Sequence, residues 1–176
     1  MLEKSLKAFL EEVAAKTSAP GGGAVAAIAA ALAAALAAMT ARFSEGQLGP
    51  EAEDVARRSD EISHAAARLA EADAEAYGAY LAARRRPEDD PERERALIEA
   101  ASRSAEVPLR IAELAAEVDR LAERLGERGN PNLGGDAFAA RSLARAATRA
   151  AANLVLVNLG DGDDVRVARA RELLEL

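Results

Sequence analysis

The sequence lacks cysteine and tryptophan, and its 176 residues include one histidine, two tyrosines and three phenylalanines. Without cysteine, the chain forms no disulfide and performs no thiolate chemistry. A single histidine excludes a histidine-rich metal site within one chain. No cluster of side chains implies a metal or a redox cofactor. We therefore expect no metal site and no permanently bound cofactor.

Positive charge is also scarce, because the sequence has 23 basic and 30 acidic residues and a net charge of -7. Nucleic-acid binding depends on neutralising phosphates, so we expect neither a nucleic-acid partner nor an anionic membrane surface. The longest apolar run, 24–39, spans about 24 Å as a helix, against about 30 Å for a bilayer core. We expect this run to be a buried helix. The acidic, amphipathic N-terminal segment is unlike a signal peptide, which favours a cytoplasmic location.

Alternation of apolar and polar residues with period two, the pattern of strands, is missing throughout. The periodicity is helical, and it predicts an all-α fold in which residues 1–176 form a single domain. The expected bundle has about five long helices and a short C-terminal helix. The five long helices are predicted over 2–16, 22–44, 50–84, 91–125 and 135–159. Pro108 lies inside the fourth and predicts a kink or a break there.

Bulky apolar side chains are few, because half of the sequence is hydrophobic but much of that half is alanine. Alanine buries little area, so such a core depends on close approach of helices. A long apolar surface of this kind can require a second copy of the chain to shield it from water. We therefore expect a homodimer or a higher homo-oligomer.

Gly21, Gly22 and Gly23 stand directly before the alanine-rich helix, in the stretch SAPGGGAVAAIAAALAAALAAMT. A helix N-terminus presents unpaired N–H groups, and glycines let a ligand approach them. The turn could therefore hold an anion or a carbonyl oxygen. It could equally be a tight turn that allows close helix packing. It is neither a phosphate loop, since no Lys-Ser/Thr follows, nor a dinucleotide-binding turn, since no strand precedes it.

Asp73 falls on the inward stripe of the third predicted helix. The other members of that stripe, spaced three or four residues apart, are Ile62, Ala66, Leu69, Ala76 and Tyr80. A buried carboxylate usually has a raised pKa, which suits a general acid/base or a group that stabilises a cationic substrate. The alternative is a structural aspartate paired with an arginine.

Two further groups of polar residues have simpler explanations from the sequence alone. Asn130, Asn132 and Asp136 lie in GNPNLGGD, where turn formation and helix capping account for them. A stripe of arginines, Arg141, Arg145 and Arg149, is typical of a solvated helix face. It could also bind a ligand carboxylate or an acidic surface of a second subunit.

Five segments in the same order resemble the cyclodeaminase/cyclohydrolase family, whose best-known member is a deaminase domain that acts on folates. They are SAPGGGAVAAIAAALAAALAAM, DAEAYGAYLAA, SAEVP, GNPNLGGD and NLVLVNL. The similarity extends over residues 2–161. It implies an all-helical fold, a homodimer or larger assembly, and a folate pocket at or near a subunit interface.

The resemblance also implies a reaction at a one-carbon unit of tetrahydrofolate. Cyclodeaminases close 5-formimidoyltetrahydrofolate to 5,10-methenyltetrahydrofolate and release ammonia, whereas cyclohydrolases open the methenyl compound to 10-formyltetrahydrofolate. Asp73 matches the family's D-x-x-A-F/Y pattern and is the implied catalytic residue. The implied substrate-binding residues are Gly21, Gly22, Gly23, Tyr77, Asn130, Asn132 and Asp136.

One element of the family pattern is absent. Many relatives carry Gly-Lys and then a tyrosine after the second helix, whereas this chain has Gly46-Gln47 and no tyrosine there. This departure supports an alternative function, a non-catalytic helical oligomer that binds folate or serves as a scaffold.

Overall fold

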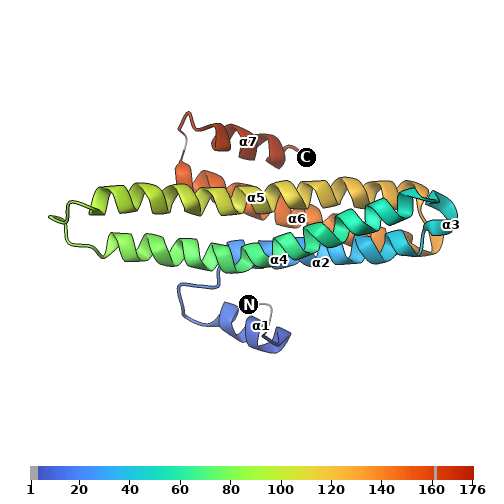
Figure 1. The fold of residues 1–176 in the computed structure, drawn as a ribbon, viewed down its shortest axis with the longest axis horizontal. Coiled ribbons are helices and arrows are strands. Elements are labelled where there is room, and N and C mark those ends of the chain that lie inside the picture. Colours follow the sequence, from blue (N-terminus) through green and yellow to red (C-terminus); the bar gives the residue numbers. More distant parts are fainter. Residues whose placement is uncertain (1–3, 161) are drawn as a thin grey trace.

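The structure is a computed structural model that describes residues 4–160 and 162–176. This part of the chain forms seven α-helices and one 3-10 turn, and contains no strand (Figure 1). The elements are α1 (Leu6–Ala14), α2 (Gly22–Arg42), α3 (Glu45–Leu48), α4 (Glu51–Arg84), α5 (Arg93–Arg128), η1 (Pro131–Leu133), α6 (Gly134–Leu159) and α7 (Val165–Leu174). The all-α prediction is confirmed.

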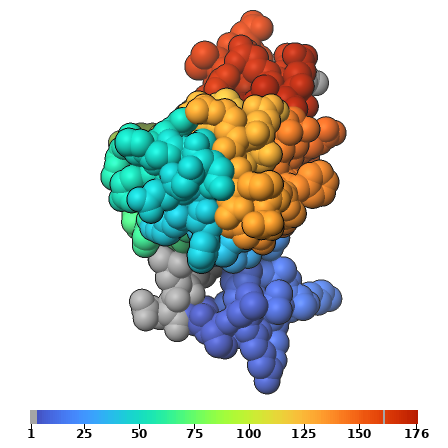
Figure 2. Space-filling model, turned by 90° about the vertical axis from the view of Figure 1, so that its right-hand side faces the viewer, coloured from blue at the N-terminus to red at the C-terminus, as the bar shows by residue number. Residues whose placement is uncertain are grey.

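The bundle has four long helices rather than five, because the first predicted helix is short. α1 begins after Ser5, whose side chain accepts a hydrogen bond from the N–H of Ala8, and ends at Ala14 before the extended Ala15. The start of the predicted range 2–16 lies outside the described residues. α1 packs extensively against none of the other helices and lies to one side of the bundle (Figures 1 and 2).

α2 is the central helix, and it packs against α4, α5 and α6. Twelve of its 21 residues are buried, ten of them alanines, so neighbouring backbones approach closely on its sides. By length and composition α2 could cross a membrane, unlike the shorter run considered in the sequence. However, 61% of its most apolar stretch is buried inside the bundle, which is the position of a core helix.

α5 continues without interruption through Pro108, contrary to the break expected there. Proline has no N–H to donate to the carbonyl four residues earlier, which is that of Ser104. That carbonyl instead accepts a hydrogen bond from Nδ2 of Asn158 on α6, at 2.5 Å. A side chain from a neighbouring helix therefore replaces the missing backbone bond.

The four long helices run side by side, and the hairpin of α4 and α5 extends beyond the N-terminus of α2 (Figure 1). At the opposite end α3 closes the bundle, beside the loop between α5 and α6 (Figures 1 and 2). α2 has 21 residues, so its N-terminus and its C-terminus lie about 30 Å apart. The position of a residue along this axis decides which site it can join.

Candidate functional site

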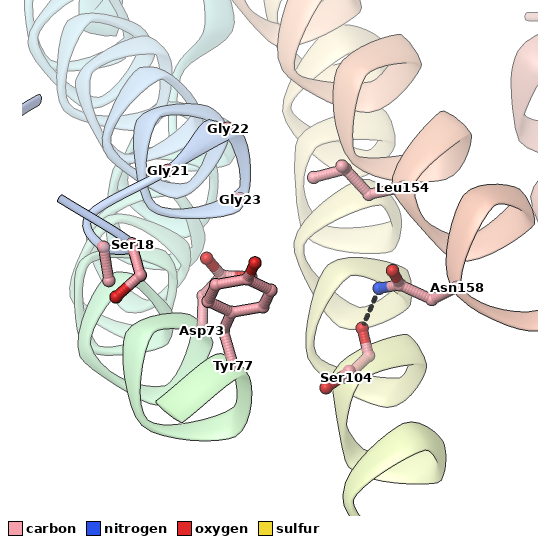
Figure 3. Close-up of a pocket in the computed structure, with 10 residues that line it drawn as sticks. Ser18, Gly21, Gly22, Gly23, Asp73, Tyr77, Ser104, Leu154 and Asn158 are labelled. Carbon is pink, nitrogen blue, oxygen red and sulfur yellow. Dashed lines mark hydrogen bonds between the residues drawn. The ribbon is translucent and has the colours of Figure 1, made fainter. Parts of the chain in front are cut away.

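A cavity of about 210 Å3 opens at the N-terminus of α2, between α4, α5 and the end of α6 (Figure 3). It combines backbone groups from the turn before α2 with side chains from the three other helices. Its lining residues are Ser18, Ala19, Gly21, Gly22, Gly23, Asp73, Tyr77, Ser104, Leu154 and Asn158. The glycine turn, Asp73 and Tyr77 therefore meet in one place, as the sequence predicts.

Asp73 lies directly against Gly23, and no side chain fits between them. A Cβ placed on Gly23 would be 2.0 Å from Oδ1 of Asp73 and 2.6 Å from its Oδ2. The same test at Gly22 finds only Leu154, at 3.9 Å, and at Gly21 it finds nothing within 4 Å. Of the three glycines, Gly23 alone is required for the position of the carboxylate.

Two features of its environment have opposite effects on the pKa of Asp73. The residue is half-buried, and burial raises the pKa of its carboxyl group above the usual value. A hydrogen bond from the backbone N–H of Ala24 opposes part of this rise in pKa. Because Gly21 provides no side-chain cap to α2, Asp73 takes that place from another helix. One of the amides considered as a ligand site, that of Ala24, thus already donates to a carboxyl group of the protein itself.

The opposite wall of the cavity is the junction of Ser104 and Asn158 (Figure 3). The carbonyl of Ser104 is the one that Pro108 leaves free, so the proline fixes the orientation of the Asn158 side chain. Ser104 Oγ lies 3.5 Å from the carbonyl oxygen of Ala76, which joins α5 to α4. Asn158 and Ser104 thus join α6, α5 and α4 at this wall.

Sequence reasoning did not select Ser18, Ser104, Leu154 or Asn158 as site residues, although the structure places all four at the cavity. Each belongs to a segment that carries the family resemblance: SAPGGG, SAEVP or NLVLVNL. The usable signal was the proline, since a helix that continues through proline leaves a carbonyl in need of a donor.

Asn130, Asn132 and Asp136, which the resemblance implies to be substrate-binding, do not line this cavity within one chain. They lie about 30 Å away, at the far end of α2. There Nδ2 of Asn130 donates to the carbonyl of Phe43 at 3.0 Å, and its Oδ1 accepts from the N–H of Asn132. Asp136 lies in the first turn of α6. Asn130 therefore ties the loop to the C-terminus of α2.

Gln47, which stands where many relatives carry lysine, lies at the same far end. It is exposed on α3, five residues after the end of α2. The backbone N–H of Asn130 donates to Oγ of Ser44 at 2.9 Å, so the asparagine loop and the segment around α3 are joined. The element that departs from the family pattern is thus remote from Asp73 within one chain.

The arginine stripe on α6 has intramolecular partners. Nε of Arg141 and Nε of Arg145 each lie 3.1 Å from Oδ1 of Asp119, a buried residue of α5. Arg141 also contacts Glu123 at 2.5 Å. Two of the three arginines therefore help to join α6 to α5, and no ligand is needed to explain them. Arg149 lies beside a small cavity that Asp119 and Arg145 also line.

In residues 4–160 and 162–176, no three His, Asp or Glu side chains are grouped to hold an ion. The cavity offers the Asp73 carboxyl group, the backbone of the glycine turn, the polar junction of Ser104 and Asn158, and the apolar side chain of Leu154. Such an arrangement suits proton transfer and cation stabilisation in a small organic molecule.

Comparison with known proteins extends over nearly the whole chain. Residues 5–173 match the family model described as formiminotransferase-cyclodeaminase. The rat formimidoyltransferase-cyclodeaminase is 36% identical over 181 residues, which cover 97% of this chain and 34% of that protein. The chain thus spans about a third of the length of this relative.

Two further relatives match over most of their own length. A methenyltetrahydrofolate cyclohydrolase from Methylorubrum extorquens is 31% identical over 96% of this chain and 85% of that protein. The crystal structure of a formiminotetrahydrofolate cyclodeaminase from Thermotoga maritima superposes with a TM-score of 0.87 at 30% identity, covering 99% of this chain and 88% of that one. These matches confirm the resemblance predicted from the five sequence segments.

Proposed function

The chain belongs to the formiminotransferase-cyclodeaminase family, and from this premise we propose that it acts on the one-carbon unit of a tetrahydrofolate. The reaction is either closure of 5-formimidoyltetrahydrofolate with release of ammonia or hydrolysis of 5,10-methenyltetrahydrofolate. Relatives named for each reaction match the chain. We place this activity in the cytoplasm.

The observation that carries the proposal is the Asp73 carboxylate, held against Gly23 in an open cavity with its pKa raised by burial. A carboxyl group whose pKa moves toward neutrality exchanges protons more readily at physiological pH. When ionised, the same group stabilises positive charge in an apolar setting. Both properties are needed at a carbon bonded to two nitrogens.

The two reactions use Asp73 in the same way. In ring closure, N10 of the folate attacks the formimidoyl carbon, and the carbon–nitrogen bond to the departing ammonia breaks. In hydrolysis, water attacks the methenyl carbon and the bond from that carbon to N5 breaks. In each case Asp73 accepts a proton from the attacking group and returns it to the departing nitrogen. Ring closure starts from the protonated formimidoyl group, and in hydrolysis the second proton of the water is released to solvent as the formyl C=O forms.

A homodimer would explain why the predicted site residues occur at both ends of α2. Val25 and Leu32 are 41% and 58% exposed on a helix that has no charged residue before Arg42. Ile28, between them, and Leu36, one turn after Leu32, are partly buried. An exposed apolar face of this kind is typical of an interface. We propose that a second copy covers it.

A two-fold axis crossing α2 near Leu32 would place the two α2 helices antiparallel. The asparagine loop of the partner subunit would then lie beside the Asp73 cavity, about 30 Å from where it lies in its own chain. This arrangement gives Asn132 and Asp136 the substrate-binding role that the resemblance implies. It also places Gln47 at the same composite site.

The experiment follows the absorbance of the methenyl compound with the purified protein and each substrate in turn. Ring closure raises this absorbance and hydrolysis lowers it, so one assay separates the two reactions. Turnover of neither substrate above the uncatalysed rate contradicts the proposal. Folate binding without turnover would favour the non-catalytic alternative, which the replacement of lysine by Gln47 supports.

A further inference from the structure

A second chamber of about 160 Å3 adjoins the Asp73 cavity on the side of the α4–α5 hairpin. Its lining residues are Tyr77, Tyr80, Ala101, Ser104, Val157 and Asn158. Tyr77, Ser104 and Asn158 line both spaces, so one cleft passes from the glycine turn across this shared wall to Tyr80.

The two parts of the cleft differ in chemistry. The first offers the backbone of the glycine turn and the Asp73 carboxylate. The second offers two aromatic rings and Val157, which is 69% exposed, and no charged side chain lines it. These two rings are the only tyrosines of the sequence. The second chamber therefore suits a planar apolar group that stacks on tyrosine.

We infer that the second chamber is the subsite for the p-aminobenzoyl ring of a folate, whose pterin lies in the Asp73 cavity. This inference rests on the proposed function. The reacting carbon of a folate lies between N5 of the pterin and N10, which carries the aryl ring. With that carbon at Asp73, the two ring systems must therefore lie in different directions along the cleft.

Hydrogen-bonding capacity decides which ring occupies which space. The pterin edge alternates donors and acceptors, and it suits the first cavity, whose lining includes the polar backbone of the glycine turn and the Asp73 carboxyl group. The faces of the aryl ring form no conventional hydrogen bond and match Tyr77 and Tyr80. Size agrees, because small-molecule pockets typically measure about 300–1,000 Å3. The first cavity, at about 210 Å3, reaches this range only with its neighbour.

The charges around the cleft support the same orientation of the folate. The glutamate that follows the aryl ring carries carboxylates, and Asp73 repels them from the first cavity. Asp73, Tyr77, Tyr80 and Arg84 follow one another at spacings of three and four residues, which places them along one face of α4. Arg84 lies in the last turn of that helix and is exposed. It therefore provides positive charge beyond the second chamber.

The absence of tryptophan makes tyrosine fluorescence a reporter of this chamber and of the wall that it shares with the Asp73 cavity, because Tyr80 lines the chamber and Tyr77 lines both spaces. The probe is p-aminobenzoyl-L-glutamate, titrated into the full chain with correction for absorption by the probe. We expect saturable quenching of the tyrosine emission. A saturable change in the parent protein supports the subsite, and its absence overturns the inference.

Variants then locate the contact. Tyr80→Ala should weaken probe binding about tenfold or more, because stacking on one aromatic side chain typically contributes this much. The matched control Tyr80→Phe keeps the ring and should bind within about threefold of the parent. Equal binding by the parent and Tyr80→Ala overturns the inference. Tyr77 remains as the reporter in both variants, and melting curves check that each is folded.

Arg84→Gln tests the direction of the tail. It should weaken binding of p-aminobenzoyl-L-glutamate about fivefold but leave binding of p-aminobenzamide, which has no carboxylate, unchanged. Equal effects on both probes contradict the assigned direction. These measurements do not depend on turnover. Probe binding without folate turnover would overturn the proposed reaction alone, whereas turnover with no effect of Tyr80→Ala would overturn the subsite alone.

Discussion

Gly23 and Asp73 form a pair in which the smallest side chain leaves room for a carboxylate. The carboxylate occupies the volume that any Cβ on Gly23 would need, and it accepts a hydrogen bond from Ala24 at the start of α2. The glycine turn therefore has a packing role and a chemical role at once, because the packing partner is the candidate acid/base.

Gly23→Ala should displace this carboxylate and lower kcat about a hundredfold, as expected for misplacement of a reacting group by about 1 Å. Gly78→Ala is the matched control, since Gly78 is exposed on α4, lines neither part of the cleft, and its added Cβ would meet nothing within 4 Å. We expect Gly78→Ala to retain activity within about threefold of the parent and to be no less stable, because alanine favours helix over glycine. The methenyl assay and thermal melting provide both measurements. Equal loss of activity in the two variants would contradict the assigned pairing.

Asp73 should also destabilise the fold at neutral pH. Its pKa in the folded protein is raised by burial, so folding favours the protonated form. This contribution is fully present below the unfolded value, near 3.8, and is lost as the pH rises through the folded pKa. Asp73→Asn should therefore melt at a higher temperature than the parent at pH 7, with the difference shrinking toward pH 4. A variant that melts lower than the parent at pH 7 would contradict this account.

At the scale of elements, helical periodicity predicted the inward face of α4, and Asp73 and Ala76 were assigned to it correctly. Periodicity does not show where along the bundle axis two helices meet. The sequence therefore did not show that the Asp73 cavity and the Asn130 loop lie at opposite ends of α2. Of the kink or break predicted at Pro108, the break does not occur, and the residue that supplies the replacement hydrogen bond, Asn158, comes from another helix.

Alanine on the inner face of α6 sets the close spacing of the helices. Ala147→Leu should lower the free energy of unfolding by about 1–3 kcal/mol, because Ala147 is 1% exposed and a larger side chain overfills the core. Ala146→Leu changes the neighbouring exposed residue and should stay within about 0.5 kcal/mol of the parent. Urea denaturation measures both. Equal stability of the two variants would mean that the core is more loosely packed than the structure shows.

At the scale of the whole molecule, the bundle presents an apolar face along α2 and predicted site residues at both ends of it. Leu32→Glu places a charge at the middle of this face and should convert the proposed dimer to a monomer with little activity. Val165→Glu, at a residue 79% exposed on α7, is the control and should remain dimeric. Light scattering after gel filtration gives the masses. A parent protein that is monomeric while active would rule out the composite site.

Mixing two inactive variants tests whether the site is shared between subunits. Asp73→Asn removes the carboxylate and Asn132→Ala alters the loop, so each homodimer should be inactive. Random mixing gives half heterodimers, each with one intact site, and should restore about a quarter of the parent activity. No recovery after verified subunit exchange would mean that Asp73 and Asn132 act within the same subunit, which contradicts the shared site.

The central claim is that the Asp73 carboxylate, held on the glycine turn, performs the proton transfer of a folate one-carbon reaction. The most direct test is kcat of Asp73→Asn in the methenyl assay, using the substrate that the parent converts and protein shown to be folded. The account predicts a loss of at least about a hundredfold with substrate binding retained, as for removal of a general acid/base. A variant that turns over within about threefold of the parent would contradict it.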